Sequence, residues 1–349
     1  MIRYYDRLTA EQKNAYAAIK TALEQKTAYA NARVSDGFVA AYEAVVFDYP
    51  LCCVSHHGVA CDYDGRSYAF VYSDADESAF YAKFDRIIDK VNTAYDRGGD
   101  MTPYGLYKAI YDVLSDMIVY DFDALKRYSS LSDNNNRAEI MRFLRKKGNA
   151  FSPYGALVEK KAVCNGIAKL YKAVCDRLGL PCACVKARRE QTIGRGEEFG
   201  DGSPCDHLLN VIEIDGGYAF VDLTNGLKTK DIPITVYDFF AVNYAVLGKS
   251  FRLLPRDLAT FDCRGADNVY FERNKLVFRN IGELRRYLAG YAFKHTNGEV
   301  RAYYSGGKVS DDDLRVIAED ILYAHCPPMK WIDNVRCVNG FITCAITDR

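Results

Sequence analysis

The chain of 349 residues has no excess of charge of either sign, because 46 lysines and arginines balance 46 aspartates and glutamates. This balance gives no indication of a nucleic-acid partner or of an anionic membrane surface. No stretch approaches the ~20 apolar residues of a membrane-spanning helix, and the start from Met1 to Asp6 lacks the apolar core of a signal peptide. We therefore expect a cytoplasmic protein with no membrane span and no nucleic-acid partner. The alternative is a secreted protein whose leader is absent from this chain.

Cysteine and histidine are both too few for some common architectures. Twelve cysteines in a chain of this length are too sparse for a disulfide scaffold. The close pairs Cys52-Cys53 and Cys182-x-Cys184 suit a reducing compartment. With only five histidines, few side chains compete for the role of general base. The sequence has no internal repeat, and its 49% of apolar residues is enough for sizeable cores.

One cysteine stands at the start of a predicted helix. The apolar residues that follow it recur at helical spacing: Ile167, Leu170, Tyr171, Val174, Cys175 and Leu178. Gly179 and Pro181 are typical of a helix end. This places Cys164 at or just before the first turn, where unpaired backbone N–H groups and the helix dipole favour an anion. We expect a thiol in that position to have a lowered pKa and to react as a thiolate.

A histidine and an aspartate follow on a predicted hairpin. Residues His207–Ile214 are mostly apolar, Asp215-Gly216-Gly217 is a tight-turn signal, and Tyr218–Leu223 predicts the returning antiparallel strand. Counted outward from the turn, His207 and Asp222 lie toward the same open end. His207 is then able to accept the thiol proton on one ring nitrogen while Asp222 holds the other.

The stretch from Ser152 to Thr224 resembles the transglutaminase-like superfamily, whose bacterial members share a Y-G-A-L-V…V-C-x-G-Y-A…H-A-W-N…W-Y-x-V-D-x-T pattern. The corresponding blocks begin at Tyr154, Val163, His207 and Tyr218. Leu209 stands where the family has Trp, and Ile167 where it has Tyr.

The resemblance implies that Cys164 is the nucleophile, that His207 is the general base and acid, and that Asp222 orients His207. Tyr154 and Asn165, which belong to the matching blocks, are candidate substrate-binding residues. The implied function is cysteine-dependent acyl transfer through a thioester, of protease, amidase or transglutaminase type, with a peptide or protein substrate and no cofactor. The alternative is a catalytically inactive member that acts as a peptide- or protein-binding module. The oligomeric state is not indicated.

Three other patterns have competing interpretations. The run from Cys52 to Cys61 holds five potential zinc ligands, but no second knuckle accompanies it, which favours a strand and turn with incidental cysteines. A second possible zinc site consists of Cys182, Cys184, Cys205 and His207. The spacing of its first two cysteines is tighter than in common zinc knuckles, which disfavours it. The glycine-rich stretch Gly194–Gly202 lacks the ending of a phosphate-binding loop, which favours a loop beside the site. We therefore expect no metal.

The fold class predicted is α+β, with a papain-like or transglutaminase-like cysteine-protease core. We divide the chain into a helical N-terminal region with a short hairpin (1–130), the core (131–258) and a small α+β C-terminal domain (259–349). In the first region, a capping box at Thr9 and Gln12 opens a helix. Ser67–Tyr72 is predicted to be a strand that pairs with Leu51–Val54, and Ser129–Asn136 a loop.

The C-terminal segment has a β-α-β-α-β-β order that is typical of a separate small domain. The predicted strands are Lys275–Phe278, Glu299–Tyr304, one near Val335, and Phe341–Thr347. The two predicted helices have Asn280 and Ser310 as their N-caps. The sequence does not indicate what this domain does.

Overall fold

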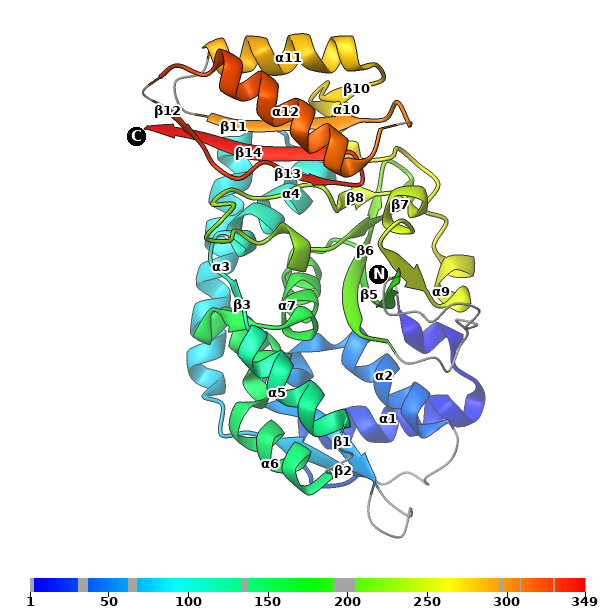
Figure 1. Cartoon of the computed structure of the whole chain (residues 1–349). Helices are drawn as coiled ribbons and strands as arrows, with labels where there is room; N and C mark the ends of the chain where they lie inside the picture. Colours follow the sequence, from blue (N-terminus) through cyan, green and yellow to red (C-terminus); the bar gives the residue numbers. More distant parts are fainter. Residues whose placement is uncertain are drawn as a thin grey trace.

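The structure is a computed structural model that describes most of the chain. The described residues are 3–30, 37–61, 68–133, 137–190, 205–294, 298–307, 309–328 and 330–348. Its sheets are mainly antiparallel and its helices are grouped, which is the predicted α+β class. Figure 1 shows helices from the start of the chain at one end of the molecule, helix α7 in the middle, and a small sheet with two helices at the other end.

The N-terminal part is mainly helical, as expected. Its elements are η1 (Tyr4–Arg7), α1 (Ala10–Glu24), α2 (Phe38–Asp48), η2 (Pro50–Cys53), β1 (His56–Cys61), β2 (Tyr68–Tyr72), α3 (Glu77–Gly98), α4 (Pro103–Ser115), β3 (Val119–Tyr120), α5 (Phe122–Asp133) and α6 (Arg137–Lys147). The predicted capping box of α1 is confirmed: the side chains of Thr9 and Gln12 each accept a hydrogen bond from the other residue's backbone N–H.

Two local predictions in this part are wrong. Strand β2 pairs with β1, whereas residues 51–53, predicted as its partner, lie in the 3-10 turn η2. Pro50 occupies the first position of that turn, where its fixed φ favours helical geometry. The predicted loop Ser129–Asn136 is helical as far as Asp133. Packing of Tyr128 against Phe151, with ring centroids 5.0 Å apart, accompanies this longer helix and outweighs the polar local sequence.

The central part contains one helix packed on a five-stranded antiparallel sheet. Its elements are η3 (Gly148–Phe151), the π-helical turn η4 (Gly155–Glu159), β4 (Lys161–Ala162), α7 (Cys164–Arg177), β5 (Cys182–Arg189), β6 (His207–Ile214), β7 (Gly217–Val221), η6 (Thr224–Gly226), β8 (Phe240–Val242), α8 (Tyr244–Leu247), β9 (Phe251–Leu253) and α9 (Pro255–Thr260). The strand order is β8-β7-β6-β5-β9. In Figure 1, α7 lies alongside β5 and β6. The side-chain amide of Asn210, on β6, donates to the Ala168 carbonyl of α7 (3.1 Å).

The local sequence explains both helix and hairpin. Helix α7 ends where predicted, because Gly179 adopts the left-handed conformation (φ +73°) that follows many helices. The hairpin turn has positive φ at Asp215 (52°) and Gly216 (79°), as a tight two-residue turn between twisted strands requires. Strands β6 and β7 pair from Ile214↔Gly217 to Asn210↔Val221.

The C-terminal segment forms a second sheet. Its elements are α10 (Val269–Arg273), β10 (Val277–Phe278), α11 (Ile281–Lys294), β11 (Gly298–Tyr304), α12 (Asp311–His325), β12 (Lys330–Ile332), β13 (Arg336–Val338) and β14 (Phe341–Asp348). The predicted order of strands and helices is present, with β12 added to it. Helices α11 and α12 lie together on the outer face of the sheet (Figure 1). The Ser310 side chain caps α12 as predicted.

The buried apolar side chains form two clusters. The larger one extends from Tyr4 to Phe341 and joins the N-terminal helices to the central sheet, and the smaller one lies within residues 284–346. Polar contacts link the C-terminal sheet to the rest: Arg336 pairs with Asp238, and the Arg301 guanidinium donates to the Thr235 carbonyl (3.0 Å). The two boundaries between the three predicted regions stay predictions. Among the described helices, none has the length and apolar character needed to cross a membrane.

Candidate active site

Cys164 is the first residue of α7. The preceding Val163 is extended (φ −94°, ψ 173°), so the chain changes direction at the cysteine. Gly166, in the first turn, lies so close to the backbone that a Cβ atom there would meet the Ser152 carbonyl oxygen at 2.6 Å. This close approach explains the glycine of the Cys-x-Gly motif, because any side chain would push the start of the helix away. The turn at Val163 and the close packing of Gly166 therefore fix the start of α7, where Cys164 is 8% exposed.

His207 and Asp222 lie side by side at the open end of the hairpin. His207 is the first residue of β6, and Asp222 follows the last residue of β7. The imidazole Nε2 atom and the Asp222 Oδ2 atom are 2.7 Å apart. Both residues are almost fully buried, at 4% and 1% exposure. A charged or strongly polar pair in such surroundings is little screened by water, so each group strongly affects the other's pKa.

Two further residues contact this pair, and the sequence analysis did not predict either of them. Asn225 donates from its side-chain amide to Asp222 Oδ2 (2.6 Å) and from its backbone N–H to Oδ1 (3.4 Å). The Phe251 ring, on β9, stacks on the His207 imidazole with centroids 4.8 Å apart and an interplanar angle of 14°. Asn225 follows Asp222 closely enough that a side-chain-capped turn was a usable signal. Phe251 is brought in by a distant strand and has no local signal.

Cys164 is the other group that interacts with His207. The thiol of Cys164 interacts with the imidazole and with the backbone N–H of Leu208. His207 Nδ1 nevertheless has no hydrogen-bond partner of normal geometry among the described residues. The thiol and the imidazole are therefore close enough to shift each other's pKa. Catalytic hydrogen bonds are often long or poorly aligned before substrate binds.

The pKa directions favour an ion pair. Burial raises the pKa of the Cys164 thiol, but contacts with His207 and with the Leu208 N–H outweigh it, so this pKa lies below its usual value. Burial lowers the pKa of His207, whereas Asp222 and the thiol raise it, to about 10 overall. The pKa of Asp222, although raised by burial, is lowered further by His207 and Asn225. Both shifts favour the charged forms of the pair, a thiolate and an imidazolium, relative to an isolated thiol and imidazole.

The two candidate substrate-binding residues lie in different surroundings. The backbone N–H of Tyr154 donates to the Ser152 hydroxyl (3.2 Å), just before η4. Asn165 follows the cysteine in α7, and its buried Oδ1 has no hydrogen-bond partner among the described residues. A buried acceptor of this kind suits an N–H donor, because burial without a partner costs about 1–3 kcal/mol. The role of both residues stays a prediction.

The possible zinc sites and the glycine-rich stretch have the following outcomes. Within the described ranges, no group of three or more His, Cys, Asp or Glu side chains is arranged to hold a metal ion. Cys182 and Cys184 lie buried on β5 against α7, and His207 faces Asp222. The glycine-rich stretch 194–202 lies outside the described residues.

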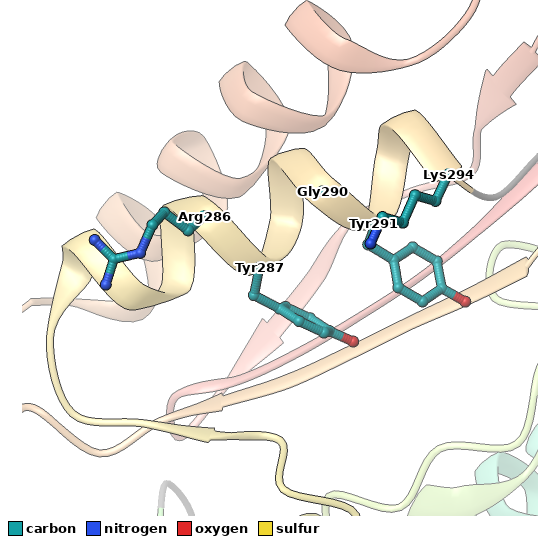
Figure 2. A pocket seen from close by; sticks show the side chains of 5 residues that line it. All are labelled: Arg286, Tyr287, Gly290, Tyr291 and Lys294. Carbon is teal, nitrogen blue, oxygen red and sulfur yellow. The ribbon is translucent and has the colours of Figure 1, made fainter.

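Two cavities occur away from the triad residues. One, of about 290 Å³, is lined by residues on one side of α11, with Tyr287 and Tyr291 pointing toward β11 (Figure 2): Arg286, Tyr287, Gly290, Tyr291 and Lys294. Both tyrosine hydroxyls donate to β11 carbonyls, those of Arg301 (3.0 Å) and Glu299 (2.9 Å). The other, of about 320 Å³, lies between α4 and β11. Neither contains a nucleophile–base pair.

We expect Cys164 to be alkylated faster than the more exposed cysteines, such as Cys205 and Cys326. Its lowered pKa extends the thiolate form to a lower pH than in an ordinary thiol, which is mostly protonated below pH ~8.5. Reactivity should fall only when the pH drops through that lowered pKa. Mass-spectrometric mapping of iodoacetamide labelling between pH 5 and 9 measures both effects. Labelling that follows exposure, with Cys205 and Cys326 ahead of Cys164, would contradict the assignment.

No known protein family matches the chain, and no curated protein is significantly similar to it. Solved structures resemble part of it. One is described as a TGase and has 19% identity over 43% of this chain and 34% of that chain, with a TM-score of 0.31. Another, from Cytophaga hutchinsonii and described provisionally as a cysteine protease, has 17% identity over 43% of each chain, with a TM-score of 0.24. In both cases the match spans less than half of the solved chain.

Proposed function

We propose that the protein is a cysteine-dependent acyltransferase or hydrolase of transglutaminase-like type that acts on amide or peptide bonds. The observation that supports this most strongly is the arrangement of three side chains on rigid elements. Asp222 holds one nitrogen of His207 at 2.7 Å, and the imidazole also interacts with the thiol of Cys164, the first residue of a helix. Nucleophile, base and orienting carboxylate in this order are sufficient for acyl transfer.

The reaction begins with the Cys164 thiolate. Its sulfur attacks the amide carbonyl carbon, and the carbonyl oxygen becomes an oxyanion. The backbone N–H groups at the start of α7 lack helical partners and are available to stabilise this charge. The His207 imidazolium then gives its Nδ1 proton to the leaving amine as the C–N bond breaks, which leaves a thioester on Cys164. Asp222 keeps the imidazole oriented and stabilises its charge.

The second half of the reaction releases the acyl group. Neutral His207 removes a proton from water or from a primary amine, and the resulting nucleophile attacks the thioester carbonyl. The C–S bond breaks and the thiolate is restored. Water gives hydrolysis, as in a protease or amidase, and an amine gives transamidation. Every proton transfer uses side chains of the chain itself, so the proposed chemistry needs no cofactor.

A panel of peptide amides, incubated with and without an added primary amine, tests this function. We expect wild-type protein to release ammonia or a shortened peptide, and Cys164→Ala to release neither. An amide product that appears only when amine is present would identify transamidation. Equal product with both proteins, or no product with either across a broad panel, would favour the peptide-binding module instead.

A further inference from the structure

Strand β3 brings a tyrosine next to the cysteine. β3 pairs in parallel with β4, with Tyr120 opposite Ala162, and the strands are joined by hydrogen bonds from the Val119 N–H to the Lys160 carbonyl (2.9 Å) and from the Asp121 N–H to the Ala162 carbonyl (3.0 Å). Residues paired across two strands project to the same face. Since Cys164 follows Ala162 by two residues, the Tyr120 side chain extends toward the start of α7.

The hydroxyl end of Tyr120 lies in the catalytic surroundings. It interacts with the backbone N–H of Cys164 and with the charges of Cys164 and Asp222. Burial and the nearby thiolate raise the pKa of this phenol well above its usual range, so that it remains an O–H donor throughout the working pH of a protein. An ionised phenolate would repel the neighbouring thiolate, whereas a neutral phenol can donate a hydrogen bond to a negatively charged atom.

The neighbours of Tyr120 hold the end of β3 against β4. The Lys161 ammonium pairs with Asp121 (3.1 Å), which joins the end of β3 to β4. The rings of Tyr120 and Phe122 meet edge to face at 4.7 Å. Val119 and Phe122 are among the most exposed large apolar residues, at 61% and 72%. The Tyr120 ring therefore lies beside one exposed apolar side chain, that of Phe122.

We propose that Tyr120 is a catalytic residue whose phenol O–H donates a hydrogen bond to the oxyanion formed during acylation of Cys164. This inference rests on the proposed acyl-transfer function. The carbonyl oxygen would take the place beside the Cys164 N–H that the phenol now occupies, and would accept from both groups. No proton moves to the oxyanion: the C–S bond forms, the carbonyl electron pair shifts to oxygen, and its return expels the leaving group.

Two reagents separate this role from an effect on the thiolate. Iodoacetamide alkylates the sulfur without forming an oxyanion, whereas p-nitrophenyl acetate acylates it through one. We expect Tyr120→Phe to slow acylation about 10²-fold, the usual effect of losing one oxyanion donor. Its alkylation rate and the pH profile of alkylation should stay within about twofold of wild type. Tyr128→Phe, at a half-buried tyrosine of α5, is the matched control and should change neither rate.

Each result has one interpretation. Unchanged acylation in Tyr120→Phe, or a parallel fall in acylation and alkylation, would overturn the oxyanion role while leaving acyl transfer by Cys164 intact. Wild-type protein that is alkylated but never acylated would instead contradict the proposed function. Tyr120→Gln provides a second variant in case the phenylalanine variant does not fold. Its amide N–H is a neutral donor, so it should retain more acylation than Tyr120→Leu, and equal rates in these two variants would count against the proposal.

Discussion

Replacing Cys164 with alanine should abolish acyl transfer while leaving the protein folded. The change removes the only atom that forms the covalent intermediate, so we expect a loss of about 10³-fold or more. The structural cost should be small, about 1 kcal/mol, because one sulfur atom is lost at the first residue of a helix and alanine suits a helical position. Turnover of a peptide amide and the thermal unfolding midpoint measure the two effects.

Cys175→Ala is the matched control for this variant. Cys175 belongs to the same helix and is completely buried, but it lies far along α7 from the triad. Its replacement should lower stability at least as much as Cys164→Ala and leave turnover nearly unchanged. Retained turnover in Cys164→Ala, or equal loss of activity in both variants, would contradict the assignment of Cys164 as nucleophile.

Asp222→Asn should reduce turnover severely without removing the nucleophile, by about 10²- to 10⁴-fold. The atom at the Oδ2 position must accept hydrogen bonds from both His207 and the Asn225 side chain, so an asparagine would place its oxygen there. Its NH₂ group would then face the Asn225 backbone N–H, and two donors would meet. The variant loses both the charge that stabilises the imidazolium and one hydrogen bond, at a cost of about 1–3 kcal/mol.

The pH dependence of alkylation shows whether the charge of Asp222 is what matters. Loss of the carboxylate should lower the pKa of His207 and weaken the ion pair. This effect is larger than the direct repulsion between Asp222 and the thiolate that is also lost, so the alkylation midpoint of Cys164 should move to higher pH. Asp312→Asn, at an exposed position of α12, is the control and should leave the profile unchanged. An Asp222→Asn profile identical to that of wild type would show that Asp222 does not act through His207.

The helix and hairpin that carry the triad residues were predictable because their signals are local. Apolar residues at helical spacing and Gly179 define α7, and the Asp215-Gly216 turn sets the register of β6 against β7. With that register known, His207 and Asp222 had to lie at the same end. The roles proposed for the three side chains rest on their identities and on these placements.

The residues that surround the triad were not predictable in the same way. Phe251 reaches His207 through β9, and Tyr120 reaches Cys164 through a two-residue strand with no periodicity to reveal it. Contacts of this kind depend on how distant segments pack. The two local errors have different origins. Pro50 at the start of a turn outweighed the weak strand preference of the residues after it, whereas packing of Tyr128 against Phe151 accompanies the helix that extends to Asp133.

The most direct measurement is to identify the residue that becomes acylated. Wild-type protein incubated with p-nitrophenyl acetate, quenched in acid to preserve the thioester and digested, should carry one acetyl group in the peptide that contains Cys164. The adduct should disappear on treatment with hydroxylamine and should not form in Cys164→Ala. An acetyl group on another residue, or labelling that persists in Cys164→Ala, would contradict the assignment of Cys164 as the nucleophile of this protein.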